Sequence, residues 1–223
     1  MDQAAVLAQV AEQVANCQAC TLFHSRKRSV PGEGPFDAEI MMIGEGPGFY
    51  ENEQGRPFVG QAGKLLEELL ASFGYRREQV FITNVVKCRP PGNRDPQPDE
   101  LAACGGYLDR QISTLQPMII VTLGRFSMAK FLPNVRISDV HGQARWVGEQ
   151  LVIPMYHPAA ALHQPALRPQ LVKDFLLLPE YIELARSKRR PVQPAAHLVA
   201  EERPDMADQP KSPADDPTQL SLF

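Results

Sequence analysis

Short apolar runs recur along the chain, and each has the length and composition of a buried β-strand. They lie at residues 40–43, 80–86, 117–124 and 151–153. Together with residues 146–149, the last run predicts a hairpin that leads into the final strand. The pattern therefore predicts four buried strands, none of which has the strict alternation of a half-exposed strand.

Segments with helical periodicity separate these runs. Over residues 4–16, Val6, Val10 and Val14 recur every four residues, which places them on one face of a helix. Further helices are expected around Leu65, over 99–115, up to Phe131 and over 169–187. Because strands that alternate with helices form parallel sheets covered on both faces, we predict a three-layer α/β/α sandwich with a mainly parallel four-stranded sheet.

The composition changes near residue 188. From there to the end, the chain has six of its 21 prolines and many acidic residues, but few large apolar side chains before the last positions. Such a segment buries too little apolar surface to fold by itself. We therefore predict a globular domain at residues 1–187 and a disordered tail at residues 188–223.

Length and composition are those of an ordinary globular protein. The 223 residues suffice for one sizeable core, and 43% hydrophobic with 22% charged residues are typical values. No apolar run approaches the roughly 20 residues that a membrane span needs. The first ten residues carry an acid and no basic group, unlike a signal peptide. We expect a cytoplasmic protein without membrane contact.

The net charge of −3 gives no indication of a nucleic-acid partner. Basic residues nevertheless cluster at residues 26–28, at Lys87, Arg89 and Arg94, and at residues 188–190. Such clusters can bind phosphates, although charge runs more often lie on a solvated surface. The charge pattern supports DNA binding only weakly.

The four cysteines form a separate pattern. Cys17 and Cys20 have the C-x-x-C spacing that lets two thiolates bind one metal centre, and Cys88 and Cys104 follow later. Structural disulfides are rare in the cytosol. Zinc sites usually repeat the C-x-x-C pair, which Cys88 and Cys104 do not, and four thiolates also suit a [4Fe–4S] cluster. The residues themselves leave zinc and iron–sulfur open.

Residues 40–66 contain the strongest candidate for a ligand site. The strand at 40–43 continues into GEGPG at residues 44–48, and a helix follows, as in the first unit of a parallel sheet. Ligands bind at the carboxyl ends of such strands, and glycine lets the backbone approach them closely. A tight turn without a ligand would also use glycine, but Glu45, Glu51 and Phe58 follow the same strand end.

Two further polar residues lie near strand ends. Asn84 stands among the apolar residues of the strand at 80–86, where an amide without partners would cost about 1–3 kcal/mol. It is either a structural amide that fixes a loop or an amide that binds a ligand. His157 follows the last strand directly. A lone histidine is more often structural, but this one lies where a ligand site is expected.

Three ordered motifs resemble those of the family 4 uracil-DNA glycosylases, bacterial and archaeal repair enzymes that carry an iron–sulfur cluster. The resemblance covers roughly residues 13–186. The motifs are GEGPG with Glu51 and GRPFVG at residues 44–60, TNVVKCRPPGNR at residues 83–94, and HPAA at residues 157–160. Together they imply the fold of these enzymes and a [4Fe–4S] cluster at the four cysteines.

The resemblance also implies an activity and a set of roles. The family flips uracil out of DNA and hydrolyses its N-glycosidic bond, which leaves an abasic site. By position, Phe58 would stack on the base, Asn84 would bind its polar edge, and His157 would stabilise the charge on the departing base. Glu51 would lie near C5 and exclude the methyl group of thymine.

Other roles are less specific. The backbone at Glu45 and Gly46 would contact the base, and Glu45 is a candidate for positioning the attacking water. A structural carboxylate that accepts loop amide hydrogens is the alternative for Glu45. Where the family commonly has two leucines after HPAA, this chain has Ala161 and Leu162. Leu162 alone would then wedge into the duplex, unless it packs against the last helix.

The chain ends in QLSLF, which resembles the peptide by which bacterial proteins bind the replicative sliding clamp. Leu222 and Phe223 would fill an apolar pocket, and Gln219 would make a polar contact. An apolar terminus without function is the alternative. We expect a monomer that is associated with the nucleoid through its DNA substrate.

A second function class competes with hydrolysis. Related uracil-DNA binding proteins trap their substrate covalently through a histidine in an extra loop. Between Cys88 and Cys104 this chain has no histidine and only a short proline-rich loop, which favours hydrolysis. An inactive iron–sulfur subunit that binds DNA without turnover is a third possibility.

Overall fold

A five-stranded sheet is the middle layer of the structure, a computed structural model that describes residues 2–189. Its strands are β1 (Ile40–Gly44), β2 (Phe81–Asn84), β3 (Ile119–Leu123), β4 (Arg145–Val147) and β5 (Gln150–Met155). In the order β2-β1-β3-β5-β4, the first four are parallel and β4 is antiparallel to β5. The mainly parallel sheet is confirmed, and the predicted hairpin adds β4 as a fifth, edge strand.

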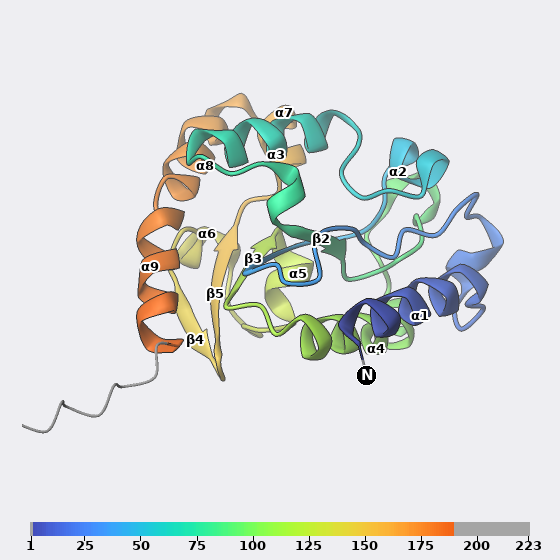
Figure 1. Ribbon diagram of the computed structural model, residues 1–223. Helices are drawn as coiled ribbons and strands as arrows, with labels where there is room; N and C mark the ends of the chain where they lie inside the picture. Colours follow the sequence, from blue (N-terminus) through green and yellow to red (C-terminus); the bar gives the residue numbers. More distant parts are fainter. Residues whose placement is uncertain (1, 190–223) are drawn as a thin grey trace, which may run out of the picture. The chain divides into compact units, whose positions relative to one another are not determined.

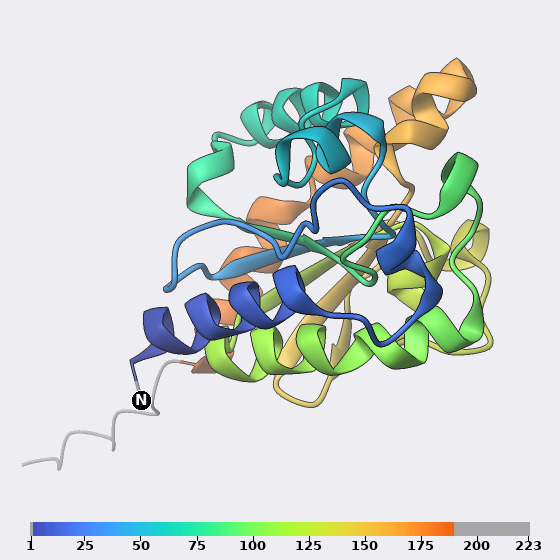
Figure 2. The same ribbon diagram turned by 90° about the vertical axis from the view of Figure 1, so that its right-hand side faces the viewer.

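Helices cover both faces of this sheet (Figures 1 and 2). The helices are α1 (Gln3–Asn16), α2 (Phe49–Gln54), α3 (Gln61–Ser72), α4 (Pro98–Leu115), α5 (Arg125–Ala129), α6 (Ile137–Val140), α7 (Pro158–His163), α8 (Arg168–Phe175) and α9 (Leu178–Arg189). α1, α4 and α5 pack on one face, and α3, α7, α8 and α9 pack on the other. These layers confirm the predicted α/β/α sandwich.

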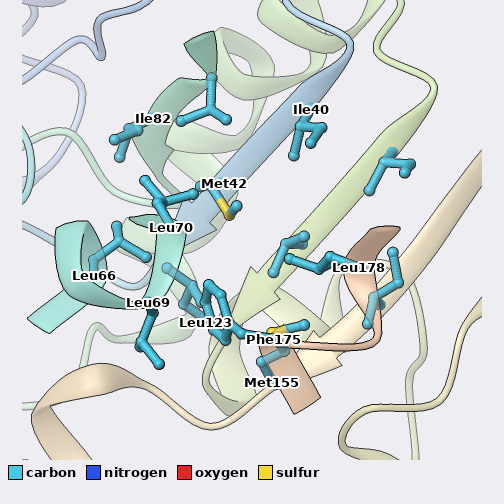
Figure 3. Close-up of a cluster of buried hydrophobic side chains, with 14 of the residues drawn as sticks. Ile40, Met42, Leu66, Leu69, Leu70, Ile82, Leu123, Met155, Phe175 and Leu178 are labelled. Carbon is cyan, nitrogen blue, oxygen red and sulfur yellow. The ribbon is translucent and has the colours of Figure 1, made fainter. Parts of the chain in front are cut away.

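The side chains of β1 alternate between two apolar cores. Met42 belongs to the cluster that includes Leu66 of α3 and Phe175 of α8, which Figure 3 shows beside the strands. Met41 points to the opposite cluster, which includes Leu108 of α4. Since all of these side chains are buried, each contributes about 1.5–3 kcal/mol through burial. Two complete cores explain why the strands are apolar on both faces.

The last predicted helix was wrong in one respect. Residues 169–187 form two helices, α8 and α9, with a turn at Leu176 and Leu177 between them. Pro179 has no N–H to donate to the preceding turn, so the helix cannot continue unbroken through this position. The periodicity of apolar residues continued across this break and concealed it.

The predicted strand at 80–86 was too long. β2 ends at Asn84, and the amides of Val85 and Val86 donate instead to the carbonyl groups of Gly44 and Glu45. These bonds fasten the segment after β2 to the glycine loop after β1. As a result, Asn84 occupies the end of its strand rather than the interior.

Over residues 2–189, no helix is both long and apolar enough to cross a membrane. The predicted tail and its terminal peptide, with Gln219, Leu222 and Phe223, lie outside the described residues. The predicted domain boundary at residue 187 stays a prediction.

Candidate functional site

The carboxyl ends of β1, β2 and β5 surround a cleft with a volume of about 390 Å³. Gly44 and Asn84 are directly opposite each other in the β1–β2 ladder, and His157 follows the end of β5. The cleft brings together the six site residues that sequence reasoning selected around the base: Glu45, Gly46, Glu51, Phe58, Asn84 and His157.

Gly44 allows the amide and the ring to approach each other. A Cβ atom added there would lie 2.4 Å from Asn84 Oδ1 and 2.7 Å from two atoms of the Phe58 ring. These separations are far below van der Waals contact, so only glycine leaves the two side chains in place. The sequence marked Gly44 as part of a glycine loop, but not as this spacer.

Asn84 presents an incompletely bonded amide to the cleft. Its side chain is buried, and Oδ1 has no hydrogen-bond partner among the residues that the structure covers. An unpaired buried acceptor costs about 1–3 kcal/mol. In the described part of the chain, no bond from Oδ1 fixes a loop, and the role of Asn84 in ligand binding stays a prediction.

His157 is held in one orientation and one protonation state. It is the N-cap of α7, and its Nδ1 accepts the backbone N–H of Ala159 at 3.0 Å. Removal from water lowers its pKa to about 4, even though the Glu51 carboxylate acts in the opposite direction. Near neutral pH the ring is therefore uncharged, and with Nδ1 accepting, the proton lies on Nε2.

The Phe58 ring is the flat wall of the cleft. It lies 5.5 Å from the His157 ring between centroids, with 22° between the planes. Its backbone has φ of +50°, in the left-handed region that bulky residues rarely adopt. Glu51 fixes the two residues that follow Phe58, because its Oε1 accepts the backbone N–H groups of Val59 and Gly60 at 2.8 and 2.9 Å.

Glu45 is a half-buried carboxylate in the wall of the cleft. Burial raises its pKa above the ordinary value for glutamate, and the nearby Asp95 adds to this effect. Arg125 acts in the opposite direction and is itself paired with Asp95. A carboxylate with a raised pKa is better suited to accept a proton than an ordinary surface glutamate.

The rim of the cleft includes three polar side chains that sequence reasoning missed as cleft residues, Asn93, Arg94 and His163. Arg94 donates both terminal nitrogens to Glu100, a fully buried carboxylate, at 2.6 and 2.9 Å. Glu100 also accepts the hydroxyl of Thr21 at 3.2 Å. Only the position of Arg94 in the resembling motif pointed to this rim.

Of the basic cluster at Lys87, Arg89 and Arg94, the prediction of a possible phosphate ligand was wrong for Lys87. Lys87 is 1% exposed, and its ammonium group donates to Thr83, to the Asn84 carbonyl and to Gln111. Burial lowers its pKa to about 7. Its position after an apolar strand was the signal that it points inward.

Leu162 lies on α7 beside the cleft but not among the residues that line it. Its side chain is 43% exposed. Its role as a wedge stays a prediction, as does the alternative that it packs against the last helix.

The four cysteines line one separate cavity, together with Arg26, Lys87 and Tyr107. Cys17 and Cys20 come from the loop after α1, Cys88 follows β2, and Cys104 lies in α4. Arg26 donates to Cys88 Sγ at 3.3 Å, and the backbone N–H of Lys87 donates to Cys104 Sγ at 3.3 Å. Donors of this kind stabilise sulfur ligands in their charged form.

Over residues 2–189, the structure groups no three His, Cys, Asp or Glu side chains closely enough to hold a metal ion. Burial raises the pKa of Cys104 to about 11 and also raises that of Cys88, so a metal centre would have to displace protons from these thiols.

Known proteins share this sequence over most of its length. The model of the uracil DNA glycosylase superfamily matches residues 31–177. A type-4 uracil-DNA glycosylase of Sulfurisphaera tokodaii is 50% identical over 179 residues, covering 76% of this chain and 81% of the relative. An enzyme of the same name from Archaeoglobus fulgidus is 48% identical, over 74% of this chain and 88% of the relative. Another, from Thermotoga maritima, is 49% identical, over 69% of this chain and 81% of the relative. The chain therefore belongs to the uracil DNA glycosylase superfamily and, within it, to the type-4 uracil-DNA glycosylases.

Proposed function

We propose that this chain excises uracil from DNA in the cleft at the ends of β1, β2 and β5. The uracil nucleotide rotates out of the duplex, at an unstacking cost of a few kcal/mol, and water replaces the base at C1′ of the sugar. The products are free uracil and an abasic site. One observation carries the proposal: Asn84 Oδ1 has no hydrogen-bond partner among residues 2–189, and it lies in a cleft whose wall also contains Phe58 and His157.

Recognition depends on the match between the cleft and one pyrimidine. The polar edge of uracil has an N3–H donor beside carbonyl acceptors, and the Asn84 carboxamide offers one acceptor and one donor to pair with them. The Phe58 ring provides a face for stacking. Because Glu51 Oε1 is occupied by two backbone amides, its other oxygen is left to face C5, where the methyl group of thymine would collide.

His157 stabilises the departing base. When the bond from C1′ to N1 breaks, the electron pair moves onto N1 and O2 of uracil. The neutral His157 ring can donate its Nε2 proton to O2 as a hydrogen bond, an effect of the oxyanion-hole type. Since Nδ1 is occupied by the Ala159 amide, the ring cannot turn this donor away without losing a bond.

Glu45 positions the water that attacks C1′. Its half-buried carboxylate lies in the wall of the cleft, and its raised pKa suits it to receive the proton that the water loses. Gly46 lines the cleft, so its backbone can contact the base. A larger residue would not fit there, because a Cβ would lie 2.8 Å from the Val86 side chain. Replacement of Glu45 by Gln keeps the hydrogen-bonding shape and should lower the excision rate more than the affinity for DNA.

The cysteine cavity holds a [4Fe–4S] cluster with Cys17, Cys20, Cys88 and Cys104 as ligands. Four sulfurs around one cavity and N–H donors to Cys88 and Cys104 support this assignment. When bound, such a cluster joins segments that are distant in sequence and contributes its binding free energy to folding. No step of base excision requires it, since it lies in a different cavity from the cleft.

Contacts outside the cleft complete the proposal. Leu162, exposed beside the cleft, inserts into the space that the flipped base leaves. The terminal QLSLF binds the bacterial sliding clamp through Gln219, Leu222 and Phe223. The protein acts as a monomer on nucleoid DNA. Deletion of residues 219–223 should abolish clamp binding and leave the excision rate on short oligonucleotides unchanged.

A single assay tests the activity. A labelled uracil-containing oligonucleotide is incubated with the protein, treated with alkali or with SDS, and separated on a gel. Hydrolysis gives alkali-labile DNA, whereas covalent trapping gives an SDS-resistant adduct and an inactive binding subunit gives neither. We expect alkali-labile DNA, and we expect Asn84→Ala and His157→Ala to lower the rate by about 100-fold or more. Unchanged rates in these variants would reject their assigned roles.

A further inference from the structure

Phe58 adopts an unfavourable backbone conformation that other residues must maintain. Among the described residues, the non-glycine positions with positive φ are Phe58, Asn93, Gln116 and Asn134, of which only Phe58 is aromatic. Left-handed backbone costs about 1–2 kcal/mol for a residue with a side chain. Strain of this kind persists where the surroundings enforce it, and it often accompanies function.

Arg77 holds the backbone of this turn. Its guanidinium group, with a side chain only 10% exposed, donates Nη1 to the Phe58 carbonyl at 2.7 Å and Nη2 to the Pro57 carbonyl. The Phe58 carbonyl also lies against α3, where a Cβ on Gly63 would be only 1.9 Å from the oxygen. Two charge-assisted hydrogen bonds from one rigid group therefore fix consecutive peptide units.

Glu33 links Arg77 to the strand that carries Asn84. The Glu33 carboxylate accepts Nε and Nη2 of Arg77 at 2.8 and 2.6 Å. Its backbone forms a bridge with Ile82 of β2, with bonds of 3.0 and 2.8 Å in the two directions. Asn84 follows Ile82 by two residues on the same strand. A continuous set of bonds thus connects the Phe58 turn with the strand of the base-reading amide.

We propose that Arg77, held by Glu33, is a positioning residue that sets the Phe58 ring at the separation from Asn84 that a flipped uracil needs. Arg77 is not among the residues that line the cleft, and its contact with that lining is its bond to the Phe58 carbonyl, so it acts through Phe58. The inference rests on the proposed function, because it takes Phe58 as the surface on which uracil stacks.

Arg56 provides a matched control. It donates to the same carboxylate, with Nε 2.8 Å from Glu33 Oε2, but its side chain is 57% exposed. In the described part of the chain its bonds go to Glu33 and not to the Pro57 or Phe58 carbonyl groups. Arg56→Gln therefore removes an arginine from Glu33 without releasing the turn.

A double-mutant cycle tests the proposal. Single-turnover excision and DNA affinity are measured for wild type, Arg77→Gln, Phe58→Ala and the double variant. We expect Arg77→Gln to lower the rate by about tenfold or more with DNA affinity within about twofold. In the Phe58→Ala background, Arg77→Gln should change the rate by less than about twofold, because its effect passes through the ring. Arg56→Gln should keep the wild-type rate.

The outcomes separate the two proposals. If wild type releases no uracil, the proposed function fails; if Phe58→Ala has no effect, the stacking role fails. If wild type and Phe58→Ala behave as expected but Arg77→Gln is as fast as wild type, the positioning role of Arg77 is overturned. It is also overturned if the effect of Arg77→Gln adds fully to that of Phe58→Ala. Arg77→Lys keeps the charge but lacks the rigid fork that holds both carbonyl groups. It serves where Arg77→Gln does not fold, and its excision rate should be lower than that of wild type.

Discussion

At the scale of single residues, the cleft depends on glycines, because a Cβ atom at these positions would collide with neighbouring groups. Gly44, Gly46 and Gly63 each leave a space that another residue fills: Asn84 and Phe58 approach Gly44, Val86 approaches Gly46, and the Phe58 carbonyl approaches Gly63. Close approach needs glycine here because of contact distances rather than backbone dihedrals, since φ is not positive at these three positions.

Gly44→Ala should damage the site more than the fold. The added methyl group would collide with Asn84 Oδ1 and the Phe58 ring, so both must move away from the position of the base. We expect the single-turnover excision rate to fall by about 100-fold.

Gly106→Ala is the control for this change. Gly106 lies in α4 with no atom within 4 Å of an added Cβ, and alanine favours helix by about 1 kcal/mol over glycine. Its excision rate should equal that of wild type. A Gly44→Ala variant that is equally fast would show that the amide and the ring need not be this close.

The protonation state of His157 gives a pH prediction. Because its pKa is lowered to about 4, the ring stays neutral as pH rises from about 5.5 to 7.5, a range in which an ordinary histidine loses its charge. His157→Gln should therefore lower the excision rate by the same factor at both values. A factor that shrinks with rising pH would mean that the charged ring is the active form.

Sequence reasoning reached some site residues and not others for a physical reason. Asn84 was identifiable because it is a polar residue within an apolar run, and His157 because it directly follows one. Arg77 and Glu33 were not, since they lie 44 residues apart in loops with many other charged residues. Such a pair becomes visible only when the fold brings the loops together.

At the scale of elements, the sheet places the site and the helices stabilise it. The carboxyl ends of β1, β2 and β5 carry the cleft residues, as expected for ligands of parallel sheets. Apolar runs and helical periodicity predicted the main strands and helices, because each element must bury one face or two. The division between α8 and α9 was missed, since the apolar pattern does not record the N–H that Pro179 lacks.

Phe175→Ala tests the core without touching the cleft. Phe175 is fully buried between α8 and the sheet, so its truncation should lower the free energy of unfolding by about 3–5 kcal/mol. Thermal or denaturant unfolding measures this change. Leu184→Ala, at a 47% exposed side chain of α9, should cost far less, and equal costs would contradict the packing described here.

At the scale of the whole molecule, the cysteine cavity joins the segment after α1, the end of β2 and α4. The net charge of −3 conceals the local arrangement, in which buried Lys87 faces the interior and Arg94 pairs with Glu100 at the rim. Neither the sum of charges nor their order in the sequence shows which of them reach solvent.

Metal analysis tests the cysteine centre. Purified protein should absorb visible light and contain about four iron and four sulfide ions per chain. Cys104→Ser should lose most of the iron and unfold at a lower temperature, because cluster binding contributes to folding. One zinc ion per chain, or a Cys104→Ser variant as stable as wild type, would contradict the assignment.

The most direct test of the central claim is a crystal structure of the protein with uracil bound. We expect the base to stack on the Phe58 ring, to pair its polar edge with the Asn84 carboxamide, and to accept a hydrogen bond at O2 from His157 Nε2. A base that occupies the cleft with its polar edge away from Asn84, or that binds elsewhere on the protein, would contradict it.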